Sequence, residues 1–168
     1  LAGDALTTGI NNTALGHAAL SAEDAHGYNV AVGYGALQVQ NAGANAFNVA
    51  VGYNAGVAVS TGVNNTLIGG NAGDALNTGS YNTALGYNTL GAATIAISNV
   101  AIGAFSLRDN VDGNKNTAVG VQALMVMDPA SNIDTYNTAV GFNAGAAVTT
   151  GIQNTLIGGL AGDALTTG

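Results

Sequence analysis

The chain has 168 residues, of which 48% are apolar and 7% are charged, with 26 glycines, one proline and no cysteine. This composition is not that of a disordered segment, which needs low hydrophobicity and high charge. The formal net charge of −7, with Arg108 and Lys115 as the only cations, disfavours nucleic acid and anionic membrane surfaces as partners. No apolar run approaches the roughly 18 residues of a membrane-spanning helix, so no membrane insertion is expected.

A short phrase, Asn-(Thr/Val)-(Ala/Leu)-(Leu/Val/Ile)-Gly, recurs through the whole chain. Successive copies begin 17, 19, 17, 17, 17, 17, 21 and 17 residues apart. A fixed period of this kind indicates a repeat architecture. The nine copies begin at Asn12, Asn29, Asn48, Asn65, Asn82, Asn99, Asn116, Asn137 and Asn154.

Each copy is typical of a strand in which Asn, Ala and Gly share one face and the Thr/Val and Leu/Val/Ile residues share the other. We therefore predict an all-β fold, a parallel β-solenoid of about nine 17-residue coils, with two short strands in each coil. The invariant glycine is expected to form the corner between the two strands, because glycine tolerates positive φ and close backbone approach. These corner glycines are Gly16, Gly33, Gly52, Gly69, Gly86, Gly103, Gly120, Gly141 and Gly158.

The phrase asparagines are predicted to stack as a structural ladder, with each side-chain amide bonding to the next coil. The Ala and Gly face is expected to fill the narrow coil interior. The Leu/Val/Ile residues then form a continuous outward apolar stripe, which on a soluble protein marks an interface. Burial of that stripe around an axis predicts a homotrimer, although a stripe alone does not distinguish three-fold from two-fold symmetry.

The order of the coils shows a duplicated duplication. Leu1–Gly9 recurs unchanged at Leu160–Gly168, and Phe47–Leu76 matches Tyr136–Leu165. Coils one and two resemble coils five and six, so the coils run A, B, C, D, A, B, an extra coil, C, D. We expect residues 1–168 to form one solenoid domain, a window of a longer array with further coils of the same fibre. The longer connectors, 38–47 and 125–136, are candidate functional surfaces because loops carry variation and binding.

The phrase Asn-Thr-Ala-x-Gly-x-x-Ala-Leu/Gly at 17-residue spacing resembles repeats of phage tail-fibre and related surface-fibre proteins. It is similar, less closely, to the head repeats of trimeric autotransporter adhesins, whose period is shorter. The resemblance implies a left-handed, trimeric β-roll on the outside of a virion or cell that serves in attachment. No self-cleaving chaperone segment of the tail-fibre type and no membrane-anchor segment of the adhesin type is visible.

Four aromatic residues directly follow a corner glycine and are candidates for surface contact with a host glycan or protein receptor. They are Tyr34, Tyr53, Tyr87 and Phe142. Elsewhere this position holds non-aromatic residues or His17, so packing against a neighbouring coil or chain explains the row equally well.

No catalytic residue, metal site or cofactor is expected. His17 and His26 lie at different coil positions, and zinc needs three or four convergent ligands. Asp4, Asp74 and Asp163 share one coil position and are interpreted as polar turn residues. Four further charged residues are interpreted as a local ion-pair set, too sparse for the acid–base pair of a polysaccharide-degrading enzyme. These four are Arg108, Asp109, Asp112 and Lys115.

The sequence therefore predicts an extracellular structural and adhesive fibre segment, the rigid shaft of a viral tail fibre that mediates host attachment. The alternative is a bacterial trimeric adhesin or cell-surface filament. A remote alternative is an ice-binding solenoid, since six of the nine first strand positions are Thr, but the next outward residue is always aliphatic.

Overall fold

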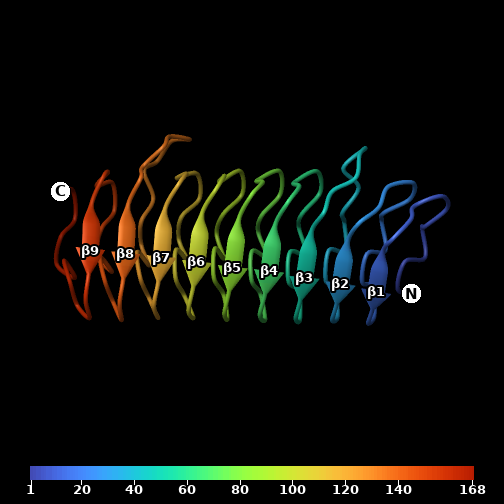
Figure 1. Ribbon diagram of the computed structural model, residues 1–168, viewed down its shortest axis with the longest axis horizontal. Coiled ribbons are helices and arrows are strands. Elements are labelled where there is room, and N and C mark those ends of the chain that lie inside the picture. Colours follow the sequence, from blue (N-terminus) through green and yellow to red (C-terminus); the bar gives the residue numbers. More distant parts are fainter.

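The computed structural model describes all 168 residues as a rod of stacked coils without helices (Figure 1). The prediction of an all-β parallel solenoid with nine coils is confirmed. Nine parallel strands form one sheet in sequence order, from β1 at one end of the rod to β9 at the other. They are β1 Thr13–Leu15, β2 Val30–Val32, β3 Val49–Val51, β4 Thr66–Ile68, β5 Thr83–Leu85, β6 Val100–Ile102, β7 Thr117–Val119, β8 Thr138–Val140 and β9 Thr155–Ile157.

Each strand pairs with the next at the same position of the repeated phrase, so that, for example, Ala84 lies beside Ala101. The two longer spacings do not disturb this register, because Val30 pairs with Val49 and Thr117 with Thr138. The extra residues are instead extruded in the connectors that follow β2 and β7, which rise above the others in Figure 1. A register slip of one residue would reverse both faces of the strand, so the buried alanines hold the pairing in place.

The expectation of two strands per coil is wrong, since each coil contains a single strand of three residues. Beyond the corner glycine, every second residue has positive φ, as at Gly86, Asn88 and Leu90 with φ of 137°, 51° and 50°. An extended strand requires negative φ throughout, so this segment forms turns instead. The turns still bond from coil to coil, because only 16 of the 92 backbone hydrogen bonds lie within the strands.

The core is a thin column inside the rod. The central strand residue points inward and is fully buried in β2 to β8. Leucines such as Leu37 and Leu124, four residues after the corner glycine, are also fully buried. The abundance of alanine keeps the two walls of each coil close together, which explains how coils of only 17 residues enclose a continuous apolar interior of 24 residues.

A ladder of asparagine side chains runs the length of the interior. The side-chain carbonyl of each phrase asparagine accepts the backbone N–H of the next one, as between Asn82 and Asn99 at 3.0 Å. The side-chain amide of Asn82 donates to the backbone carbonyl of Ala96 at 2.8 Å, in the following connector. The carbonyl bond recurs at all eight steps from Asn12 to Asn154, at 2.8–3.1 Å. Each asparagine therefore ties its own coil to the next through a side chain that is largely shielded from water.

The corner glycines occupy a position that strongly favours glycine. Their φ values lie between 114° and 141°, where residues with a Cβ are strained. A Cβ on any of the first eight would also collide with the backbone of the next corner glycine. At Gly158, in the last coil, an added Cβ meets only the Ala161 side chain at 4.0 Å.

The pair Gly69→Ala and Gly158→Ala separates these two effects. Both substitutions impose backbone strain of about 1 kcal/mol, but only Gly69→Ala forces a Cβ into the Gly86 carbonyl group. We expect Gly69→Ala to cost about 2–4 kcal/mol and to lower the thermal midpoint clearly more than Gly158→Ala. Equal losses in a melting experiment followed by circular dichroism would show that coil stacking does not dictate glycine here.

Asn82→Ala tests the ladder. It leaves the buried N–H of Asn99 and the carbonyl of Ala96 without partners, which should cost about 2–4 kcal/mol. The control is Asn154→Ala, because no N–H of a following coil binds Asn154 in this chain. The ladder account fails if both variants melt at the same temperature.

Candidate functional site

The surface has no pocket, so the candidate site is a face of the rod. The outward sides of the nine strands form it, with one row of Thr or Val and one row of Leu, Val or Ile. No charged residue interrupts either row. Leu15 and Ile157 in the terminal strands are 66% and 70% exposed, whereas most residues between them are half-buried by their neighbours in the stack. The second row comprises Leu15, Val32, Val51, Ile68, Leu85, Ile102, Val119, Val140 and Ile157.

One border of this face is formed by the residues directly after the corner glycines, here called the Gly-side column. The predicted contact residues Tyr34, Tyr53, Tyr87 and Phe142 all lie in it and are exposed. His17 stacks on Tyr34 with ring centres 5.0 Å apart, and Tyr34 stacks on Tyr53 at 5.5 Å. Phe105, one position further along its coil, meets Tyr87 edge to face.

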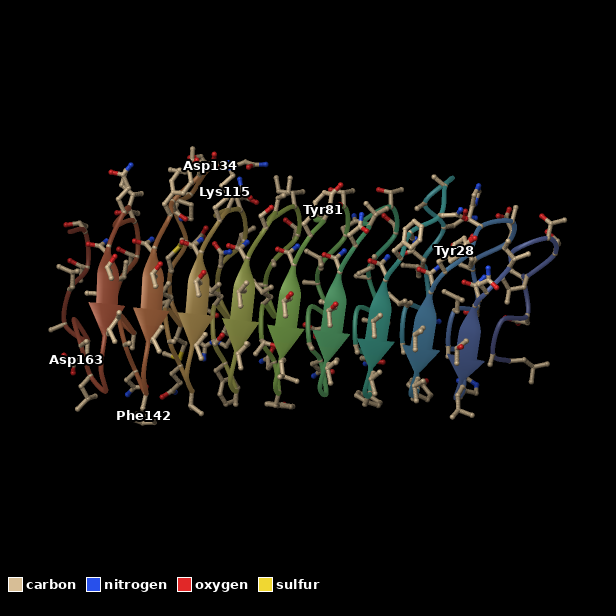
Figure 2. The ribbon with its side chains drawn as sticks, viewed as in Figure 1. Tyr28, Tyr81, Lys115, Asp134, Phe142 and Asp163 are labelled. Atoms are coloured by element: carbon tan, nitrogen blue, oxygen red, sulfur yellow. The ribbon has the colours of Figure 1, made fainter.

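A second aromatic column borders the opposite end of the strands and was not predicted. It consists of the residues directly before the ladder asparagines and is here called the Asn-side column. Figure 2 shows Tyr28 and Tyr81 at one edge of the rod and Phe142 at the other. Tyr28 stacks on Phe47 at 5.0 Å. The aligned copies of the repeat do show these aromatic residues, one position before the repeated phrase. The aromatic members are Tyr28, Phe47, Tyr81 and Tyr136.

All nine residues of the Asn-side column have positive φ, between 53° and 65°. Asparagine accepts this left-handed conformation with little strain and occupies the column at Asn11 and Asn64. A bulky aromatic residue in the same conformation is unusual. The four aromatic residues of this column therefore stand where the coil itself favours a different residue.

Lys115 also belongs to the Asn-side column and pairs with the next coil rather than within its own connector. Its Nζ donates to Asp134 Oδ2 at 2.7 Å and lies 5.2 Å from the centre of the Tyr136 ring. The hydrogen bond lowers the pKa of Asp134 and raises the pKa of Lys115. The local ion-pair set expected from the sequence is thus divided. Stacking of the coils places residue 115 beside the connector of the following coil, so Lys115 pairs there and not with Asp109 or Asp112.

Arg108 forms the other half of that expected set. Its Nε and Nη2 both donate to the carboxylate of Asp109, each at 2.6 Å. This hydrogen bonding raises the pKa of Arg108. Both cations of the chain are therefore neutralised by adjacent carboxylates.

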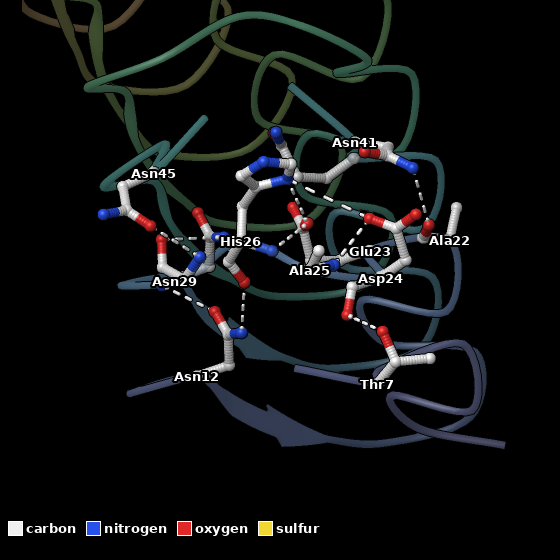
Figure 3. A network of polar contacts seen from close by, with 12 residues as sticks. Thr7, Asn12, Ala22, Glu23, Asp24, Ala25, His26, Asn29, Asn41 and Asn45 are labelled. Atoms are coloured by element: carbon white, nitrogen blue, oxygen red, sulfur yellow. Dashed lines mark hydrogen bonds and ion pairs between the residues drawn. The ribbon is translucent and has the colours of Figure 1, made fainter. Parts of the chain in front are cut away.

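The connector before β2 contains three residues whose side chains could act as ligands of a metal ion, Glu23, Asp24 and His26 (Figure 3). Glu23 is fully buried, and its Oε1 accepts the His26 backbone N–H at 3.1 Å and lies 3.4 Å from His26 Nδ1. Asp24 Oδ1 accepts the backbone N–H of Ala25.

Two buried atoms of this group, Glu23 Oε2 and His26 Nδ1, lack hydrogen-bond partners. With an Asp24 carboxylate oxygen, the group offers three ligand atoms within 4.8 Å of one another, the smallest number of protein ligands in a zinc site. In the duplicate coil the positions of the three residues hold Ala93, Thr94 and Ala96, so the fold of the coil does not need them. In this coil the Glu23 and Asp24 carboxylates bind backbone N–H groups of their own connector.

The three aspartates that share one coil position are not brought together. Asp4 precedes β1, Asp74 follows β4 and Asp163 follows β9, so several coils separate them. Partial burial raises the pKa of the Asp74 carboxyl group. Its Oδ1 has no hydrogen-bond partner.

No protein-family model, curated protein or solved structure matches the chain. None of the structure's segments is a helix of the length and apolarity needed to cross a membrane.

Asp74→Asn should raise the thermal midpoint slightly at neutral pH. Because the Asp74 pKa is raised in the folded state, the folded chain binds this proton more tightly than the unfolded chain. The wild type therefore gains stability as the pH falls from neutral toward the range in which carboxyl groups titrate. The difference in thermal midpoint between the wild type and Asp74→Asn should shrink over that range. Asp163→Asn, at the exposed equivalent position, is the control. A difference in thermal midpoint between the wild type and Asp74→Asn that stays constant from neutral to acidic pH would contradict this expectation.

Proposed function

We propose that the chain is a structural and adhesive fibre segment, a rigid extracellular shaft built from three parallel copies, as in a viral tail fibre used for host attachment. The observation that carries the proposal is the uncharged outward face of β1 to β9, an apolar strip as long as the rod. Such a strip on a soluble protein marks an association surface. The largely buried asparagine ladder and the hydrogen bonds around each coil support the rigidity that a shaft requires.

The width of the face suits an assembly of three copies better than one of four. The two border columns lie six positions apart along the chain, which corresponds to at most roughly 20 Å. Three faces of this width closing into a triangle would place each sheet roughly 6 Å from the common axis, where branched aliphatic side chains from all three chains meet. Four copies would leave an open centre. Two faces packed directly would have the ordinary sheet separation of about 10 Å, so the preference for three copies over two comes from the resemblance to trimeric fibres and is tested by the mass of the assembly.

The same geometry would serve a bacterial cell-surface filament. The segments joined to the repeats distinguish the two settings, since a self-cleaving chaperone domain belongs to the tail-fibre resemblance and a membrane β-barrel to the adhesin resemblance. In either setting, the receptor of the adhesive function would be a glycan or a protein of the host surface.

Ile102→Asp tests whether the outward face associates. The new carboxylate would lie near the axis of the assembly beside its two symmetry copies, so we expect the complex to dissociate to single chains at micromolar concentration. Sedimentation velocity measures the change, and circular dichroism verifies that the β-fold persists.

Thr78→Asp is the matched control. It adds the same charge at an exposed connector position, where another coil already has Asp112. The proposal predicts that this variant stays associated like the wild type. An Ile102→Asp variant that sediments as the wild type does would remove the outward face from the interface.

A further inference from the structure

We propose that the Asn-side and Gly-side columns are the two halves of one seam between neighbouring copies of the chain, packed parallel and in register. Each coil of one copy would place its Asn-side aromatic residue against the Gly-side aromatic residue of the same coil in the next copy. This inference rests on the self-association proposed above and specifies its geometry.

The first argument is that the same four coils, those of β2, β3, β5 and β8, contain the aromatic residues of both columns. No other coil has an aromatic residue in the Asn-side column, and in the Gly-side column the others have His17 or a small or aliphatic residue. The four pairs are Tyr28 with Tyr34, Phe47 with Tyr53, Tyr81 with Tyr87, and Tyr136 with Phe142.

The second argument comes from the duplicated coils, in which aromatic residues are gained or lost in both columns together. The coil of β1 has Asn11 and His17, whereas its duplicate has Tyr81 and Tyr87. The coil of β2 has two tyrosines, whereas its duplicate has Ser98 and Ala104. Duplication alone would preserve each column, so the paired changes indicate that the two positions depend on each other.

The coils of β3 and β8 show the same dependence in another form. The first has Phe47 and Tyr53, and the second has Tyr136 and Phe142. Phenylalanine and tyrosine have exchanged columns, yet each coil keeps one of each. A shared contact would explain this exchange, because it holds one ring with a hydroxyl group and one without.

The contact that links the columns does not lie within a single chain. The aromatic contacts of the structure run along one column or to Phe105, and none joins the Asn-side column to the Gly-side column. All eight aromatic residues are 40–61% exposed. Four of them also have the positive φ that asparagine would adopt with less strain. Their presence is explained if a second copy covers them.

Symmetry decides which coils meet. A rotation about a common axis parallel to the rod keeps every coil at its own height and brings the Asn-side border of one copy to the Gly-side border of the next. An antiparallel pair would instead set the coil of β3 against the coil of β7, which has Lys115 and Val121 rather than aromatic residues. Only the parallel arrangement matches all four aromatic pairs.

Cysteine cross-linking tests the seam, since the chain has no cysteine of its own. Tyr81→Cys/Tyr87→Cys is treated with a bis-maleimide too short to span the roughly 20 Å between the columns of one chain. We expect covalent trimers on a denaturing gel. Tyr81→Cys/Phe142→Cys joins coils at different heights and should not cross-link.

The single variant Tyr81→Cys should not cross-link either. An antiparallel pair would place residue 81 of one copy near residue 81 of the other, because both lie in the middle coil, and would therefore cross-link this variant. Cross-linking of the single variant, or a sedimenting trimer in which the double variant does not cross-link, would overturn the seam and leave the proposed shaft intact. A wild-type monomer would overturn both proposals.

A second variant does not depend on cysteine. Tyr81→Asn/Tyr87→His gives the coil of β5 the border residues of its duplicate, so it should fold. We expect association to weaken by about tenfold or more, because aromatic contacts are lost at every interface of the ring. We also expect the thermal midpoint of the dissociated chain to change little, because the strain relieved at position 81 offsets the lost edge-to-face contact between Tyr87 and Phe105. Unchanged association would contradict the seam.

Discussion

The hydrogen bond from each asparagine side chain to the backbone of the next coil is the interaction on which the structure depends. The side-chain carbonyl binds the N–H of the same residue one coil later, so one residue type at one position repeats the bond along the entire rod. This requirement fixes the register, keeps the asparagine side chain inside and leaves little room beside it. Alanine in seven of the nine strands and glycine at the corner follow from that lack of room. Leu67 and Leu156 hold the same position in β4 and β9, where they lie against Gly73 and Gly162.

The same constraint determines what lies outside. Because asparagine, alanine and glycine fill the inward face, the alternate residues of every strand must point outward, and they are Thr, Val, Leu or Ile throughout. The charged residues lie outside the strands, and the two cations are paired with carboxylates. The rod therefore has one uncharged apolar face with aromatic borders, and self-association is the simplest way to remove that face from water.

The coil phrase was sufficient to predict the solenoid, the inward asparagines and the outward aliphatic row, because alternation along a strand is a local property. The second strand was wrongly predicted because it was inferred from the 17-residue length of the coil, and the positive φ values at Gly86, Asn88 and Leu90 do not appear in the sequence. The Asn-side column was missed because Tyr28 and its equivalents precede the recognised phrase. The pairing of Lys115 with Asp134 depends on a connector lengthened in one coil, which the average repeat does not describe.

The mass of the wild-type chain in solution, measured by light scattering over a range of concentrations, tests the central claim most directly. The account predicts a stable species of three chains of 16.3 kDa, about 49 kDa, because the apolar face and both aromatic columns are buried between copies. A soluble species of 16.3 kDa at every concentration would contradict it, since the exposed face would then have to be tolerated by a single chain.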